Sequence, residues 1–379
     1  GVAGTDLVLF VVAADDGPMP QTAEHLAILD LLGVTHGVVA LTKIDRVDAS
    51  RVAAVSADTR ALLAGTALAD CAIVPVSAQT GTGIDTLRQT LLALKRSVPP
   101  RADSGNFRLA VDRSFLLKGV GRIVTGTVFT GSIGVGDSVH VVPGGGELRV
   151  RGLHTQSAVA ESARAGQRCA LNVTGTRGEV EIPRGTWIVA PGAVFDSRRL
   201  DVDIALLASE RDALRSRTAV HVHLGAAHTT GRLRAEPGHT LEPGTRTRAQ
   251  LHLDEPMHAV RGDRLILRDS SAQRTIGGGL VIDPLPDPTR RHRDLRAQRL
   301  DALSAPRLDD ALAALLAASP DGLDLERCAQ AWNLTASEAD ALWSRVPMLR
   351  YGDAAAALAV APARWQALLA ACPEALTRL

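Results

Sequence analysis

Three continuous apolar runs near the start of the chain constrain its fold more than any other feature. The runs are residues 7–14, 37–41 and 72–76. Segments with the spacing of amphipathic helices follow them, at residues 23–32, 49–64 and 84–94. Continuous apolar runs are typical of parallel strands buried on both faces, and their alternation with helices predicts an α/β arrangement. We therefore expect residues 1–98 to form one α/β unit.

Residues at the ends of the second and third runs have the chemistry needed to read guanine. The motif T-K-I-D begins at Thr42, directly after the second run, and Ser77-Ala78 follows the third. The two oxygens of Asp45 can accept both donors on one edge of guanine, N1–H and the 2-amino group. Lys43 can lay its aliphatic stem along the base, and a backbone N–H near Ser77 and Ala78 would donate to guanine O6.

A lone T-K-x-D also fits a strand end followed by an ordinary surface loop. The S-A pair after the next strand and the glycines at Gly81 and Gly83, which open the next helix, favour the guanine site. Adenine lacks the donor pair that Asp45 would accept, and sites built on such bonds reject the wrong partner by roughly 10⁴-fold or more. These residues therefore predict a site selective for guanine nucleotides.

A phosphate-binding loop is missing from the sequence. Such a loop reads G-x-x-x-x-G-K-[ST], and none of the lysines Lys43, Lys95 and Lys118 has a glycine before it and a serine or threonine after it. We therefore expect a partial P-loop GTPase domain, its C-terminal half. It would contact GTP or GDP through the base and contain no catalytic residue. We expect it to bind GTP poorly and not to hydrolyse it, and Mg²⁺ would belong to the intact protein.

Beyond Pro99-Pro100 the pattern changes to short strands separated by glycine turns, which predicts two β-barrels. We place the barrels at residues 101–176 and 180–286, an arginine-rich linker at 287–303, and a winged-helix module of three short helices and two strands at 304–379. The predicted fold class is therefore multidomain: a partial α/β P-loop GTPase domain, two β-barrels and a mostly α winged-helix module.

Composition excludes several classes of protein. The net charge is +1, so any contact with nucleic acid must come from a local patch. The four cysteines are Cys71, Cys169, Cys328 and Cys372. They form no C-x-x-C pair, which argues against a zinc ribbon and favours a cytoplasmic protein. His221, His223 and His228 have no cysteine or carboxylate nearby at ligand spacing, so we expect no metal site there.

Several motifs together resemble one family. They are residues 13–17 (A-A-D-D-G), 21–26 (Q-T-A-E-H-L), 40–47 (A-L-T-K-I-D-R-V), 111–115 (V-D-R-S-F), 118–127 (K-G-V-G-R-I-V-T-G-T), 166–172 (G-Q-R-C-A-L-N), 221–223 (H-V-H), 227–232 (A-H-T-T-G-R) and 264–269 (R-L-I-L-R-D). With this domain order they resemble the bacterial selenocysteine-specific translation elongation factor, SelB. Thr42 supports the narrower family, because most GTPases have asparagine there. The resemblance implies a fragment that lacks the N-terminal half of the GTPase domain and the distal winged helices.

The resemblance implies delivery of selenocysteinyl-tRNA to the ribosome at UGA codons, by a monomer that does not bind membranes. It places Asp112, Arg113 and Arg168 around the selenol side chain. A selenol is far more acidic than a hydroxyl, so two guanidiniums positioned by a carboxylate would favour the selenocysteine anion over neutral serine. On chemistry alone, Asp112-Arg113 also fits a surface ion pair worth little energy. In the family, the winged helices bind an mRNA hairpin, and here only one such module is complete.

Two other functions stay open at this point. One is a general carrier of aminoacyl-tRNA like elongation factor Tu, which Thr42, the Asp112-Arg113 pair and the winged helix oppose. The other is a non-enzymatic RNA- or tRNA-binding remnant, which a phosphate loop encoded upstream of Gly1 would oppose.

Overall fold

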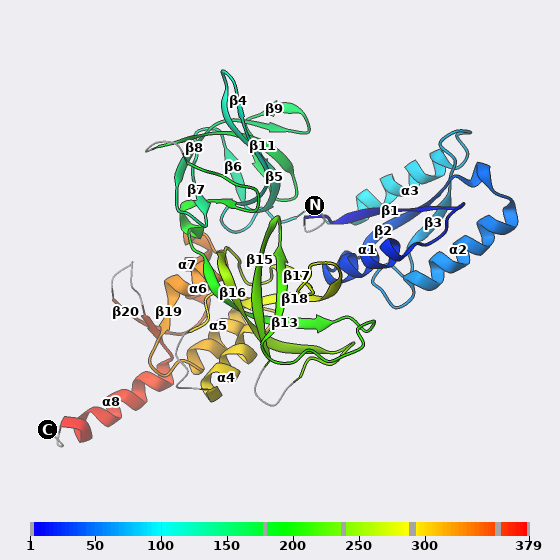
Figure 1. The fold of residues 1–379 in the computed structure, drawn as a ribbon. Helices are drawn as coiled ribbons and strands as arrows, with labels where there is room; N and C mark the ends of the chain where they lie inside the picture. Colours follow the sequence, from blue (N-terminus) through cyan, green and yellow to red (C-terminus); the bar gives the residue numbers. More distant parts are fainter. Residues whose placement is uncertain are drawn as a thin grey trace.

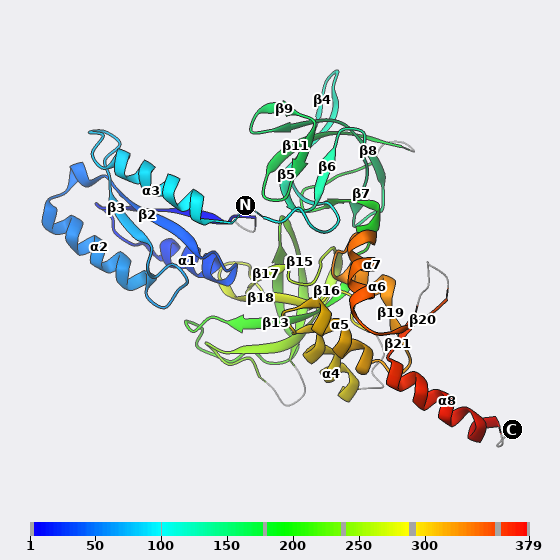
Figure 2. The same ribbon diagram turned by 180° about the vertical axis from the view of Figure 1, so that it is seen from behind.

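The computed structural model describes residues 4–99, 101–176, 180–235, 240–287, 293–352 and 358–376. These residues form four successive units: a sheet with three helices, two β-barrels and a mostly helical module (Figure 1). The barrels and the helical module lie against one another, and the first unit lies to one side of them (Figure 2). In the described part of the chain, no helix is both long and apolar enough to cross a membrane.

The first unit is the predicted α/β arrangement. Its parallel strands, in sheet order, are β1 (Leu7–Ala13), β2 (His36–Thr42) and β3 (Ala72–Pro75). Its helices are α1 (Pro20–Leu31), α2 (Ala49–Leu63) and α3 (Ile84–Ser97). Helices α1 and α2 bury one face of the sheet, and α3 covers the other face at β2 and β3. On the α3 face of β1, Leu9 and Val11 are 44% and 59% exposed.

Six strands close the first barrel. Their order is β11-β5-β4-β12-β7-β8, and β8 pairs back to β11. The strands are β4 (Arg108–Leu117), β5 (Gly121–Thr130), β7 (Ser138–Val142), β8 (Glu147–Thr155), β11 (Arg168–Gly175) and β12 (Trp187–Val189). Outside this ring, β6 (Ser132–Gly134) pairs with β10 (Ser162–Arg164), and β9 (Ala158–Ala160) forms an antiparallel pair with the end of β8.

Strand β12 corrects the sequence-based division of the barrels. It pairs with β4 and β7 and so belongs to the first barrel. The division places residues 187–189 in the second barrel, at 180–286, and this is wrong for this strand. Three apolar residues between loops show no alternation that would assign them to either barrel, because their pairing partners lie far away in sequence.

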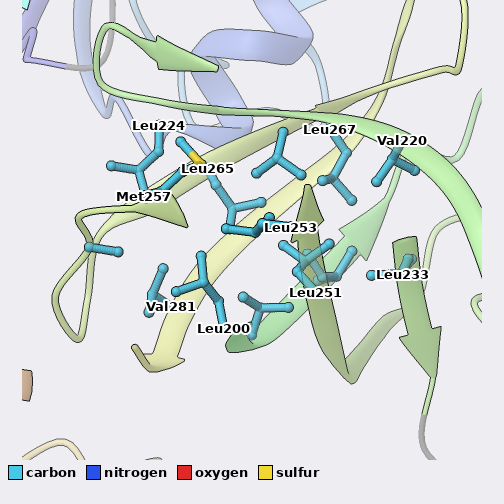
Figure 3. Close-up of a cluster of buried hydrophobic side chains, with 14 of the residues drawn as sticks. Leu200, Val220, Leu224, Leu233, Leu251, Leu253, Met257, Leu265, Leu267 and Val281 are labelled. Carbon is cyan, nitrogen blue, oxygen red and sulfur yellow. The ribbon is translucent and has the colours of Figure 1, made fainter. Parts of the chain in front are cut away.

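The second barrel is closed by six strands in the order β13-β16-β15-β14-β17-β18. They are β13 (Ser197–Leu206), β14 (Thr218–Leu224), β15 (Ala227–Ala235), β16 (Arg246–Met257), β17 (Arg264–Arg268) and β18 (Thr275–Asp283). Alternate residues of β13, β14 and β17 point inward, as the period of a strand requires. Figure 3 shows the leucine- and valine-rich core of this barrel.

The C-terminal module has helices α4 (Arg293–Leu303), α5 (Leu308–Ala317), α6 (Leu325–Ala331), α7 (Ala336–Arg345) and α8 (Pro362–Leu376). Its small sheet contains β19 (Leu323–Asp324), β21 (Leu358–Val360) and β20 (Leu349–Tyr351) in that order. Thr335 begins α7 through a capping box, in which Thr335 and Glu338 satisfy each other's backbone N–H groups. The predicted helical linker at 287–303 is helical from residue 293 onward, and residues 288–292 lie outside the described part.

The two barrels share one core. Trp187 of the first barrel is fully buried among core residues of the second. Arg108, also fully buried, donates to both carboxylate oxygens of Asp263 (3.1 and 2.5 Å) and, through Nε, to His258 Nε2 (2.8 Å). His258 therefore accepts at Nε2, and its Nδ1–H donates to the Phe195 carbonyl (2.9 Å). Burial lowers the pKa of His258 well below its usual value, which keeps the ring neutral beside Arg108.

Candidate functional site

The structure brings the predicted guanine-reading residues together where β2 and β3 end. Thr42 is the last residue of β2, Lys43 adopts a left-handed conformation (φ 59°), and Asp45 lies in the short 3₁₀ helix Ile44–Arg46. The Ile44 N–H lies 3.4 Å from the Val76 carbonyl and so joins this loop to the one that contains Ser77 and Ala78. Both loops lie at the carboxyl ends of parallel strands, where ligands bind in open α/β sheets.

The Ser77 loop is held by its own hydrogen bonds. Ser77 is fully buried, its N–H donates to the Thr82 carbonyl (2.9 Å), and its hydroxyl accepts from the Thr80 N–H (3.1 Å). Gly83 (φ 74°) permits this turn, because a Cβ there would lie 2.1 Å from the Pro75 carbonyl oxygen. The Ser77 N–H is therefore already used, so of the two predicted donors to guanine O6 the Ala78 N–H is the one that this bond does not occupy.

Asp15 is a residue of this site that the guanine motif alone does not predict. Its carboxylate accepts from Lys43 Nζ (3.0 Å) and also pairs with Arg46 (3.1 Å). The hydrogen bond from Lys43 is the main cause of the lowered pKa of Asp15, and it raises the pKa of Lys43 in turn. The sequence signal was the Asp15-Asp16-Gly17 turn at the end of the first apolar run. Asp15 thus holds the lysine stem that would lie along the base.

Asp112 and Arg168 form a fork-like ion pair on the outer surface of the first barrel. Arg168 donates through Nε (3.2 Å) and Nη2 (2.9 Å) to the two oxygens of Asp112. Asp112 lies in a β-bulge, where β4 shifts register between Val111 and Arg113. Val111 faces the barrel core, so Asp112 faces outward next to Arg168 on β11, and the extra residue of the bulge leaves Arg113 exposed as well.

Thr125 is a second residue that the motif does not predict. Its hydroxyl donates to Asp112 (2.6 Å) and accepts from Arg168 Nη2 (3.2 Å), so it bridges the pair. Arg113 follows Asp112 and is exposed, and among the described residues it has no hydrogen bond or ion pair. Since Asp112 pairs with Arg168, Arg113 adds to this surface a positive charge that no acidic side chain among the described residues pairs with.

Two histidines of the second barrel, His223 and His228, stack on each other. His223 and His228 have ring centroids 5.7 Å apart with an angle of 17° between their planes. Burial, followed by the nearby His228 and Arg268, lowers the pKa of His223 to about 4, so the ring is neutral near pH 7. Within the described residues, no group of three or more histidine, cysteine or acidic side chains is arranged to hold a metal ion.

Comparisons with known proteins agree with the two kinds of unit found here. Residues 201–288 match the family described as "Selenocysteine-specific elongation factor, beta-barrel domain", and residues 1–97 match "Elongation factor Tu GTP binding domain". The chain is 41% identical over 292 residues to the selenocysteine-specific elongation factor of Desulfomicrobium baculatum. It is 40% identical over 291 residues to that of Escherichia coli K12. The alignments cover 77% of this chain, and 46% and 45% of those relatives.

Solved structures show the same architecture. A crystal structure of bacterial selenocysteine-specific elongation factor EF-Sec superimposes with a TM-score of 0.75 and 26% identity, over 95% of this chain and 57% of that one. The apo form of SelB from Methanococcus maripaludis shares the fold, with a TM-score of 0.66 over 74% of this chain and 65% of that one. The predicted resemblance and fold class are confirmed, and the similarities indicate a translational GTPase family. The chain spans a little under half the length of its two bacterial relatives.

Proposed function

We propose that the protein delivers selenocysteinyl-tRNA to the ribosome at UGA codons, as a GTP-dependent elongation factor in the cytoplasm. The observation that carries the proposal is the Asp112–Arg168 fork with the unpaired Arg113 beside it. A guanidinium with no partner attracts an anion, and a selenocysteine side chain is an anion where serine is neutral. The similarity to selenocysteine-specific factors over most of the chain supports the same cargo.

The guanine site supplies the nucleotide part of the proposal. Asp45 would accept from the two donors of the guanine edge, the Ala78 N–H would donate to O6, and Lys43, held by Asp15, would lie along the base. Thr42 and Ser77 fix the two loops through their hydrogen bonds to Val12 and Thr80. We propose that GTP or GDP binds here through its base alone.

Phosphate and metal binding need residues that these 379 residues do not contain. No G-x-x-x-x-G-K-[ST] loop is present in the sequence, so no lysine cradles the β- and γ-phosphates. We therefore expect this polypeptide to bind GTP weakly and not to hydrolyse it, and steady GTP turnover by the purified chain would contradict this.

The test of the cargo compares two aminoacyl forms of one tRNA. Selenocysteinyl-tRNA and seryl-tRNA with the same tRNA body would be titrated against the chain, so that contacts to the tRNA body cancel. A charged hydrogen bond contributes about 1.5–3 kcal/mol, so we expect the selenocysteinyl form to bind at least about tenfold more tightly. Equal affinities would contradict the proposed cargo and leave a general tRNA carrier.

A further inference from the structure

The helix-turn-helix of the C-terminal module consists of α6, α7 and the turn between them. In DNA-binding proteins with this motif, the second helix enters the major groove and its N-terminal residues contact the base edges. The corresponding surface here is the first turn of α7 and the turn that precedes it. Asn333 and Leu334 lie in that turn, and Glu338 lies in the first turn of α7.

The segment that leads into the first barrel already occupies this surface. The Gly105 N–H donates to both carboxylate oxygens of Glu338 (3.0 and 3.2 Å). The Asn106 N–H donates to the Asn333 carbonyl (3.0 Å), and the Asn106 side-chain amide donates to the Leu334 carbonyl (2.8 Å). Backbone groups of two distant segments therefore satisfy each other here.

The turn is shaped for this contact. Asn333 has a left-handed backbone (φ 56°) and is 4% exposed, and its Nδ2 donates to the Asn106 carbonyl and to Thr130 Oγ1, both at 3.0 Å. Gly105 has a φ of 79°, and a Cβ on it would lie 2.7 Å from Asn333 Nδ2. Only glycine fits at that position, because both the backbone angle and the available space exclude a side chain.

The second barrel holds the same turn from the other side. The Arg261 N–H donates to the Ala331 carbonyl (2.8 Å), next to the turn. The Arg261 guanidinium donates to the carbonyls of Leu303 (2.8 Å) and Ala305 (2.6 Å) and lies 6.0 Å from the centroid of the Trp332 ring. The end of α6 is therefore fixed between the two barrels.

We propose that the winged-helix module uses this surface, the one such modules ordinarily present to nucleic acid, to hold the two barrels of its own chain, and that α7 does not read RNA. The charge of the surface agrees with this. The first turn of α7 contains the acidic Glu338 and no basic residue, whereas a helix that reads nucleic acid needs positive charge. The module then fixes the two barrels relative to each other, and this structural role does not depend on the tRNA cargo.

Amide hydrogen exchange of the whole chain tests the proposal, with and without a G·C-rich synthetic RNA stem-loop. We expect the Gly105 and Asn106 amides to be protected. Asn333→Asp replaces the Nδ2 donor with a carboxylate oxygen that faces the Asn106 carbonyl and Thr130 Oγ1. The Gly105 and Asn106 amides should then exchange at least about tenfold faster. Asp340→Asn, on an exposed position of α7, should leave them unchanged, and the RNA should not alter exchange across residues 333–345.

A second variant keeps the test decisive if Asn333→Asp does not fold. Glu338→Ala removes, at a partly exposed position, the acceptor of the Gly105 amide and of the Thr335 amide. Both amides should then exchange faster, while the Asn106 amide, whose acceptor is the Asn333 carbonyl, should stay protected. Unprotected Gly105 and Asn106 amides in the unmodified chain would overturn the proposal. Slower exchange in α7 on adding the RNA would also overturn it, because the helix would then be free to bind nucleic acid.

Discussion

The two interfaces of the second barrel differ in kind. Toward the first barrel and the helical module, it is joined by shared apolar cores: Trp187 enters its core, and Ile282 of β18 belongs to the core of the helices. Toward the first unit, its contacts are mainly polar, between Arg268 and Glu24 (3.2 Å) and between Arg264 and the Leu31 carbonyl (3.4 Å), although the Leu31 side chain also lies close to Gly278. Shared cores resist separation, whereas partly exposed polar contacts contribute little.

This difference indicates a rigid block and an attached unit. The two barrels and the helical module form the block, which contains Asp112, Arg113 and Arg168. The first unit contains the loops after β2 and β3, where guanine is proposed to bind. It packs on the block mainly through α1 against β17 and β18. Such polar interfaces permit rotation of one domain against another, so we expect the orientation of the first unit to change more easily than the arrangement within the block.

The largest predicted effect comes from breaking the block at Asp263. Asp263→Ala leaves the buried Arg108 charge without its partner, which typically costs about 3–5 kcal/mol. Denaturant unfolding measures this loss. Asp203→Ala, which removes a pair with the 53% exposed side chain of Arg246, is the control and should cost about 1 kcal/mol or less. Equal losses for the two variants would mean that the barrels are not joined through Arg108.

The second effect concerns the contact between the second barrel and the helices. Burial raises the pKa of Asp283, at the end of β18, to about 6. A raised carboxyl pKa means that the folded chain binds the proton more tightly than the unfolded chain. Its contribution to stability is therefore present below about pH 4 and is lost as the pH rises to about 6.

Asp283→Asn removes this pH dependence. The free energy of unfolding of the variant, minus that of the unmodified chain, should rise by about 2 kcal/mol between pH 4 and pH 7. Taking the difference cancels the other carboxylates, which titrate in both chains. A constant difference over this range would show that Asp283 ionises as it does in the unfolded chain. The helices would then not exclude water from the end of β18.

The smallest effect on stability belongs to the attached unit. Glu24→Ala removes the contacts to Arg268, which is partly exposed, and to Thr275, which is buried, and should cost about 1 kcal/mol. The same variant should increase the radius of gyration in small-angle X-ray scattering, because the first unit is freed from the block. Glu255→Ala, which removes an exposed pair with Arg198 within the second barrel, should leave the radius unchanged. An unchanged radius in Glu24→Ala would contradict the division into block and attached unit.

Local sequence patterns are sufficient to predict the helices and strands, but not the contacts between distant segments. The apolar runs predicted β1, β2 and β3, and the glycine-separated strands predicted two barrels, because these signals lie within a few residues. Strand β12 and the Arg108–Asp263 pair were not predicted, since each joins segments more than forty residues apart in sequence. The motifs contain Asp112 and Arg168, but only the pairing of β4 and β11 with β5 shows why they meet and why Thr125 lies between them.

The charge of Arg113 gives the most direct test of the proposed aminoacyl site. Arg113→Gln removes the uncompensated guanidinium, and the preference for selenocysteinyl-tRNA over seryl-tRNA should fall by about tenfold or more. Arg151→Gln, an exposed arginine on β8 of the same barrel, serves as the control for general weakening of tRNA binding. An Arg113→Gln chain that binds selenocysteinyl-tRNA with undiminished preference would contradict the account, because the anion would then be recognised elsewhere.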